Sequence, residues 1–454
     1  MIGGSLRSAD PDRQTLDEPQ RIVARETAQG LVTLDAAGQV RPGLAESWIV
    51  TDDGLSLIFR LRHARWPDGS DVTAPQVAAS LARGVGAASH NSLKPLLMAV
   101  GGIVPMTGRI IEVRLRVPRP NMFQLLAQPE LGIRREGLGA GPWRAVRQGG
   151  ALVLTPLPDP DMDADTPPPL VTQVTLRSER VGKAIARFQA GRAALVSGGT
   201  LADWPVAQAA HERSLRIDPA EGLFGIGIRP TTPMLRDVTI REALAMAIDR
   251  EAMGLITGVP RWTVAQRLLP AQLDSARVPV EPNWGTTSLD DRRRAARSRI
   301  AGWIAVHGEP APLKIALPAG PGMRLVMARL TVDFRMIGLR VEAVAWNVPD
   351  ADLVLIDEVS PNGSANWYLT RTGCEAGFAC SDLSEQALQA ARVAPSLVER
   401  ARAIADADAA AAQASGYIPL STPLRWSMVD ESLNGWRENA FAVHPLGELR
   451  VPRN

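Results

Sequence analysis

The sequence predicts an α/β fold divided into two or three lobes. At 454 residues, the chain is too long for a single hydrophobic core. Residues 313–344 have the pattern of strand, helix and strand, with the right-handed crossover expected of parallel strands. Residues 352–356 add a further buried parallel strand. By contrast, Asp53-Gly54 before the alternating segment 55–62 predicts a hairpin, so antiparallel sheet is expected as well.

Composition indicates an ordinary globular protein. The chain is 45% apolar and 22% charged, with a formal net charge of +2. Its only basic block, Asp291-Arg-Arg-Arg294, is interpreted as a solvated helix face, so we expect no nucleic-acid partner. No run reaches the apolar length needed to span a bilayer. Residues 1–10 lack a hydrophobic signal core, which leaves three explanations open: a removed leader, a misplaced start, or a cytoplasmic protein.

The stretch from residue 42 to residue 83 predicts a turn, a strand, a second turn and the start of a helix, in that order. It contains Pro42-Gly-Leu-Ala-Glu-Ser-Trp48 and Trp66-Pro-Asp-Gly69, whose tryptophans are predicted to be core residues. Thr73 is a predicted N-cap and Pro75 fits the first helical turn.

The rest of the chain alternates between strand and helix patterns. In residues 237–250, the apolar positions share one helical face, and the helix is predicted to continue to a stop at Gly258. The Gly-rich segment 137–143 is not read as a dinucleotide loop, because Pro142 stands where the last glycine belongs. Further strands are predicted at 28–35, 110–117, 171–176, 195–197, 223–228 and 415–420, and further helices at 121–127, 181–191 and 396–414.

The two cysteines, Cys374 and Cys380, lie close together in a Gly-containing loop. A local disulfide is favoured over two free thiols, and a metal site is disfavoured because no histidine lies nearby. The acidic loop 158–169 lacks the glycine and distal glutamate of a calcium loop, and the five histidines have no metal-ligand spacing. We therefore expect no metal and no cofactor.

The order of these phrases resembles the extracellular solute-binding proteins of family 5, the receptors of peptide, dipeptide and nickel ABC importers. The phrases are those at 42–83, Gly137–Trp143, Asp237–Arg250, Gly338–Val344 and Ile418-Pro-Leu420. The resemblance implies a bilobal periplasmic-binding-protein-like fold (type II, cluster C) with an additional small domain. The implied domains are a first lobe of residues 1–42 with 138–222 and 438–454, a small domain of residues 43–137, and a second lobe of residues 223–437.

The resemblance also implies a function. The chain is expected to capture a small solute, by default a peptide or a peptide-like compound, in a cleft between two lobes and to deliver it to an ABC permease in the inner membrane. A periplasmic monomer is expected, and a membrane anchor is left open. The alternatives are a cleft hydrolase, for which no Gly-x-Ser-x-Gly, His-Glu-x-x-His or phosphate loop is present, and a cytoplasmic ligand-sensing domain, for which no helix-turn-helix is visible.

Candidate ligand-binding residues follow from the family's contact regions and from the loop beyond strand 352–356, where open α/β sheets bind ligands. Peptide-binding members place an aspartate in this loop to pair with the peptide's amino terminus. The chain has Ser360-Pro-Asn362 at the closest register, which leaves open a different polar solute, unless a shifted register lets Asp357 or Glu358 supply the acid. A solvated loop edge, core packing or surface ion pairs remain open for these residues. The candidates are Glu26, Thr27, Gln29, Arg261, Trp262, Asp357, Glu358, Ser360, Asn362, Trp367 and Arg371, with no catalytic residue among them.

Overall fold

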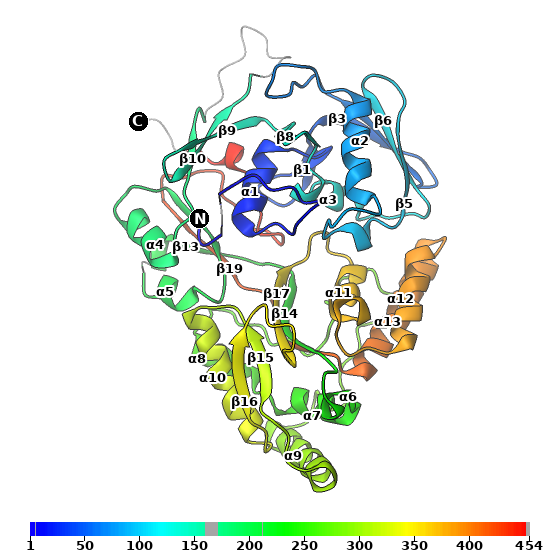
Figure 1. Cartoon of the computed structure of the whole chain (residues 1–454), viewed down its shortest axis with the longest axis vertical. Helices are drawn as coiled ribbons and strands as arrows, with labels where there is room; N and C mark the ends of the chain where they lie inside the picture. Colours follow the sequence, from blue (N-terminus) through cyan, green and yellow to red (C-terminus); the bar gives the residue numbers. More distant parts are fainter. Residues whose placement is uncertain (5, 159–170, 211, 451–454) are drawn as a thin grey trace. The chain divides into compact units, whose positions relative to one another are not determined.

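The computed structural model describes residues 1–4, 6–158, 171–210 and 212–450 (Figure 1). The chain divides into two compact units. Unit 1 comprises residues 1–199, 210–219 and 425–454, and unit 2 comprises residues 200–209 and 220–424. Within the described residues, no helix combines the length and the apolar character required to cross a membrane. The acidic loop, apart from residue 158 itself, and His211 lie outside the described residues.

Unit 1 contains several small antiparallel sheets. The largest has the order β3-β4-β6-β5, and Gly54 turns the β3–β4 hairpin with a φ of 68°, as Asp53-Gly54 predicts. Its strands are Ala45–Val50, Ser56–Leu61, Ile110–Leu115 and Val100–Pro105 for β3, β4, β6 and β5. The others are β1 (Val32–Leu34), β2 (Val40–Pro42), β7 (Arg134–Arg135), β8 (Leu138–Gly139), β9 (Trp143–Gln148), β10 (Ala151–Pro156), β11 (Val174–Leu176), β12 (Leu195–Gly199), β13 (Leu215–Asp218) and β19 (Arg425–Val429).

Two helices of unit 1 begin at capping boxes that their sequences encode. Thr73 and Gln76 form a capping box at the start of α2, and Gln76 also accepts a hydrogen bond from the indole of buried Trp66 at 3.0 Å. Asp17 and Gln20 form a second box at α1. The α-helices are α1 (Glu18–Thr27), α2 (Ala74–Val85), α3 (Met122–Leu126) and α4 (Val181–Gln189), with 3-10 turns at Lys94–Leu96, Pro129–Leu131, Glu212–Ser214 and Leu446–Glu448.

Unit 2 is built on one five-stranded mixed sheet of order β16-β15-β17-β14-β18. β15 pairs in parallel with β16 and β17, while β14 pairs antiparallel with β17 and β18. The strand–helix–strand unit predicted at 313–344 is present as β15, α10 and β16. The strands are β14 (Gly222–Ile228), β15 (Leu313–Leu317), β16 (Val341–Ala345), β17 (Leu353–Val359) and β18 (Tyr417–Ser421).

Nine α-helices accompany this sheet in unit 2. They are α5 (Trp204–Gln208), α6 (Pro233–Arg236), α7 (Val238–Ala247), α8 (Arg250–Thr257), α9 (Leu289–His307), α10 (Pro321–Arg335), α11 (Ala365–Thr372), α12 (Asp382–Val393) and α13 (Leu397–Ala414), with a 3-10 turn at Cys374–Ala376.

Three sequence-based expectations need correction. The helix predicted to run unbroken to Gly258 is two helices, because Asp249 leaves the helical conformation and caps α8 by accepting from the amide of Ala252 at 2.9 Å. The strand predicted from residue 28 begins only at Val32, since Ala28 is the C-cap of α1. Trp48 is half-buried against Phe123 rather than fully enclosed, whereas Trp66 is a core residue.

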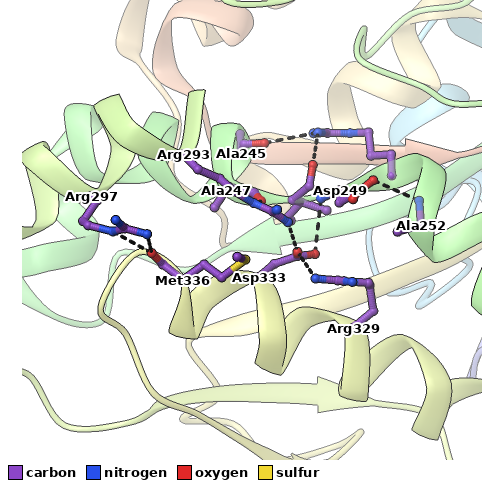
Figure 2. Close-up of polar contacts among 11 residues, drawn as sticks. Ala245, Ala247, Asp249, Ala252, Arg293, Arg297, Arg329, Asp333 and Met336 are labelled. Carbon is purple, nitrogen blue, oxygen red and sulfur yellow. Dashed lines mark hydrogen bonds and ion pairs between the residues drawn. The ribbon is translucent and has the colours of Figure 1, made fainter. Parts of the chain in front are cut away.

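Guanidinium groups close the end of α7 (Figure 2). Arg250 donates through Nη1 to the carbonyls of Ala245 and Ile248 at 3.2 and 3.3 Å, and Arg293 donates through Nε to that of Ala247 at 3.1 Å. The last carbonyls of a helix lack partners within it and carry partial negative charge, so these cations stabilise the C-terminus.

Candidate functional site

The C-terminal end of β17 reaches beyond its neighbour in the sheet. On one side of β17, β15 pairs with Leu353 and Val354 only. On the other side, β14 pairs with the whole of β17, as far as Val359. Past Val354, β17 therefore has a strand partner on one side only, within the described residues. Such an edge can pair with an extended ligand backbone. Asp357 and Glu358 occupy this portion, and Asp357 lies opposite Phe224.

Glu358 is joined to Arg371 of α11 by a two-point ion pair. Arg371 donates through Nε to Oε2 at 2.8 Å and through Nη2 to Oε1. The pKa of Arg371 is raised, chiefly by its hydrogen bond to Glu358. The side chains remain 36% and 42% exposed, so the pair can be reached by a solute, but its two charges already compensate each other.

The loop after β17 is held in a fixed conformation. The amide of Ser360 donates to the carbonyl of Glu221 at 2.8 Å, and its hydroxyl accepts from the amide of Gly363 at 3.0 Å. Asp274 accepts from the amide of Ala365 at 3.0 Å and from Arg400 at 2.8 Å. Ser360 and Asn362 are buried in this loop. The position expected to carry an acid therefore presents a neutral hydroxyl that is part of the loop's own hydrogen bonding.

Both tyrosines of the chain, Tyr368 and Tyr417, lie in this region, and the sequence analysis did not select either. The phenol of Tyr417 packs against Gly225. A Cβ added to this glycine would lie 2.4 Å from the phenol oxygen. Tyr368 is fully buried, and its hydroxyl has no partner among the described residues. Burial raises the pKa of both phenols, and Tyr368 and Glu358 raise that of Tyr417 further. The available signal was that Tyr368 directly follows the candidate Trp367 in sequence, whereas nothing in the sequence placed Tyr417 near the predicted loop.

The predicted aromatic residues are in packed positions. Trp367 is 5% exposed and packs edge-on against Tyr368 at 4.9 Å, so it is a core contact more than an open wall. Trp262 packs edge-on against Phe224 at 5.9 Å, and its buried indole nitrogen has no partner within the described chain. Arg261 precedes it in the left-handed conformation, with a φ of 55°, and is exposed.

Cys374 and Cys380 form a disulfide at the end of α11. Phe378 inside the closed loop lies against Gly227, and the amide of Ala379 donates to the carbonyl of Ile228 at 2.7 Å, so the loop is fastened to β14. The sulfurs lie close to Glu385, the one such grouping of potential metal ligands in the described part of the chain. Because the disulfide consumes both thiolates, this grouping offers no metal site.

Three candidates lie in unit 1, and each makes a hydrogen bond within that unit. Glu26 is buried, and its carboxylate accepts from the amide of Leu446 at 2.9 Å. Burial raises the pKa of Glu26 to about 7. Thr27 donates its hydroxyl to the carbonyl of Val23 at 2.7 Å, and the carbonyl of Gln29 accepts from the amide of Ile133 at 3.0 Å.

A family model matches most of the first two thirds of the chain. Residues 39–295 match the model described as bacterial extracellular solute-binding proteins, family 5 Middle. This span is more than half of the chain.

Known proteins and structures agree with this match. The chain is 26% identical over 339 residues to the probable deoxycholate-binding periplasmic protein YgiS of Escherichia coli. The match covers 64% of this chain and 60% of YgiS, so the chain spans less than two thirds of the length of YgiS. It is 23% identical to the periplasmic oligopeptide-binding protein OppA of E. coli, covering 75% and 69% of the two chains. The fold is similar to Haemophilus influenzae OppA in complex with RPPGFSPFR, with a TM-score of 0.84, 18% identity and coverage of 98% and 97%.

Proposed function

Because the chain belongs to the bacterial extracellular solute-binding proteins of family 5, we propose that it is the substrate-binding receptor of an ABC importer, which captures a small solute and delivers it to a membrane permease. The predicted family and the α/β periplasmic-binding-protein-like fold are confirmed. Members of this family are receptors rather than enzymes, so the hydrolase alternative has no support. Such a receptor releases its solute unchanged.

The observation that carries the proposal is the arrangement at the end of β17. Past Val354, β17 has a strand partner on one side only among the described residues, and such a strand end can pair with the backbone of an extended solute. Beside it lie a compensated ion pair, Glu358–Arg371, and Tyr368, whose buried hydroxyl has no partner among the described residues. Directional hydrogen-bonding groups on a rigid framework are what a specific small-molecule site needs. We assign the solute contacts of unit 2 to this surface, including Asp357, Ser360, Asn362 and Arg371.

The position at which peptide-binding members carry an acid favours a solute recognised there without an ammonium group. Ser360 is neutral, and Glu358 is already neutralised by Arg371, so neither presents an uncompensated carboxylate to a peptide's amino terminus, and Asp357 is the one carboxylate of the assigned contacts outside this ion pair. A solute's own carboxylate can instead share Arg371. Peptide-like compounds with blocked or absent amino groups are therefore the proposed class. The deoxycholate named for YgiS, which has no amino group, is consistent with this range.

A thermal-shift screen on the full chain tests the proposal. Peptides, their N-acetylated forms, opines, bile acids, sugars and metal chelates form the panel. A solute at about 100 times its Kd stabilises the folded state by about 2.7 kcal/mol, or roughly 5–11 °C for a unit of this size. We expect a hit, with N-acetylation of a peptide hit leaving the shift unchanged. The absence of any hit in the panel would contradict the receptor function.

The hit then locates the site. Arg371→Ala should weaken binding at least tenfold, while the exposed Arg294→Ala should leave it unchanged, because Arg294 lies on α9 and pairs only with Asp291. Unchanged affinity in Arg371→Ala, or a peptide hit that requires a free amino terminus, would remove the assigned contacts but not the receptor function.

The remaining parts of the proposal concern location and assembly. The family is periplasmic, so we place this chain in the periplasm. We propose that it acts as a monomer without nucleic-acid partners, and a lipid anchor is one means of keeping such a receptor near its permease. Fractionation of cells with and without detergent, followed by size-exclusion chromatography, tests these points.

A further inference from the structure

Two arginines of unit 2 share one tryptophan ring. The guanidinium carbon of Arg250 lies 5.5 Å from the ring centroid of Trp284, and that of Arg292 lies 5.4 Å from the same centroid. Trp284 is 8% exposed and Arg250 is 3% exposed, so this group lies inside the unit. An indole face stabilises a nearby cation, but it offers no hydrogen-bond acceptor in the plane of the guanidinium group.

The donors of these guanidinium groups are only partly used. Arg250 donates through Nε to the carbonyl of Pro419 at 2.8 Å and through Nη1 to the end of α7, but its buried Nη2 has no partner among the described residues. The buried Nε and Nη1 of Arg292 have none either. Each buried donor left unpaired costs about 1–3 kcal/mol, and more when it is charged. Three such atoms around one ring therefore need an acceptor.

The charges around Arg250 and Arg292 also indicate a missing anion. The described residues include no carboxylate in an ion pair with Arg250 or Arg292. Asp249 and Glu251 of α8 attract Arg292 from a distance, and Asp333 attracts Arg250, but Arg293 repels Arg292. Burial, together with the neighbouring charge of Arg292, lowers the pKa of Arg250 to about 9. The phenol of Tyr417 also faces Arg250.

The adjacent arginines share a carboxylate. Arg293 and Arg329 both contact the carboxylate of fully buried Asp333, the latter at 2.6 Å (Figure 2), although the buried Nε of Arg329 has no partner among the described residues. The described residues place no equivalent carboxylate on Arg250 or Arg292.

We propose that Arg250, Arg292 and Trp284 form a binding site for a small inorganic oxyanion such as phosphate or sulfate. A tetrahedral oxyanion supplies acceptors in several directions at once, and guanidinium groups bind such anions through charge-assisted hydrogen bonds. Arg292 is partly exposed as a residue, but its unpaired donors are buried, so its side chain has to reorient to admit the anion from that side. Its arginines and tryptophan come from α8, α9 and the loop that carries Trp284, whereas the proposed solute surface is built on β17 and α11.

The test compares the full chain with Arg292→Gln, because Arg250 also closes α7 and its replacement endangers folding. Unfolding temperatures are measured in phosphate, sulfate, acetate and chloride at matched ionic strength and pH, with phosphate binding measured directly by calorimetry. Phosphate and sulfate stabilise folded proteins generally, so the readout is the difference between variants. Arg294→Gln, two residues after Arg292 and on the exposed side of α9, serves as the matched control.

We expect saturable binding of phosphate or sulfate to the wild type and to Arg294→Gln, and at least a tenfold weaker affinity in Arg292→Gln. Acetate and chloride should give a weaker response, because they offer fewer acceptors. The proposal is wrong if no saturable binding is seen, if Arg292→Gln retains the wild-type affinity, or if chloride matches phosphate.

Discussion

Removing the carboxylate of Asp333 should destabilise unit 2 strongly. Asp333 is fully buried in α10, contacts Arg293 of α9 and Arg329 of its own helix, and accepts from the amide of Asp249 at 3.2 Å. The side chains of Arg293 and Arg329 are only 11% and 18% exposed. Asp333→Asn keeps the shape of the side chain but strands two mostly buried cations.

The expected loss follows from this geometry. Breaking a buried ion pair by removing one partner costs about 3–5 kcal/mol, because the remaining charge is left uncompensated. For a unit of this size, that loss corresponds to a fall of roughly 6–20 °C in its unfolding temperature. Calorimetry of the full chain should show the transition of unit 2 shifting, and hydrogen exchange should speed up at the ends of α7, α9 and α10, which Asp333 and Arg293 connect.

Two further variants separate charge from packing. Asp291→Asn, on the exposed part of α9, should cost less than about 1 kcal/mol, because surface ion pairs contribute little. Asp333→Leu combined with Arg293→Met and Arg329→Met should recover most of the loss, since apolar replacement of a whole buried ion cluster is often neutral. If this triple variant is no more stable than Asp333→Asn, the reasoning from stranded charge is refuted.

Two other predictions concern Glu26 and the disulfide. Glu26 has a folded-state pKa of about 7 against an ordinary 4.5, so the folded chain binds the extra proton and its stability should fall by about 3 kcal/mol as pH rises from 4.5 to 7. Glu26→Gln should abolish that slope in unfolding measured across pH, and an unchanged slope would assign it elsewhere. Replacing Cys374 and Cys380 by serine should remove about 2 kcal/mol of stability, as expected for so short a loop. Reductant should weaken the wild type to the same extent and leave the double variant unaffected; equal behaviour in reductant and oxidant contradicts this.

The sequence predicts those parts of the fold that are encoded locally. The strand at 313–317 and the cap at Thr73 were found because alternation and capping chemistry act over a few residues. The break between α7 and α8 was missed, since the helical pattern continues through Asp249 and only the cap interrupts it.

The candidate site is less accessible to such reasoning. The loop after β17 could be placed, because ligands bind beyond the ends of such strands. The contact of Tyr417 with Gly225 depends on a strand pairing between segments about 190 residues apart. Likewise, the pairing of Glu358 with Arg371 depends on how α11 folds back, which no spacing rule reveals.

Neighbouring positions on α9 sharpen the argument for an anion site. Arg292 and Arg293 are consecutive, so a helix directs their side chains about 100° apart and into different surroundings. Arg293 meets Asp333, which also pairs with Arg329. Arg292 meets Trp284 and a second buried arginine instead. If the role of both arginines were only structural, we would expect Arg292, like Arg293, to lie beside a carboxylate. An arginine pair on one ring, with three unused donors, is instead what a site that takes its negative charge from solution requires.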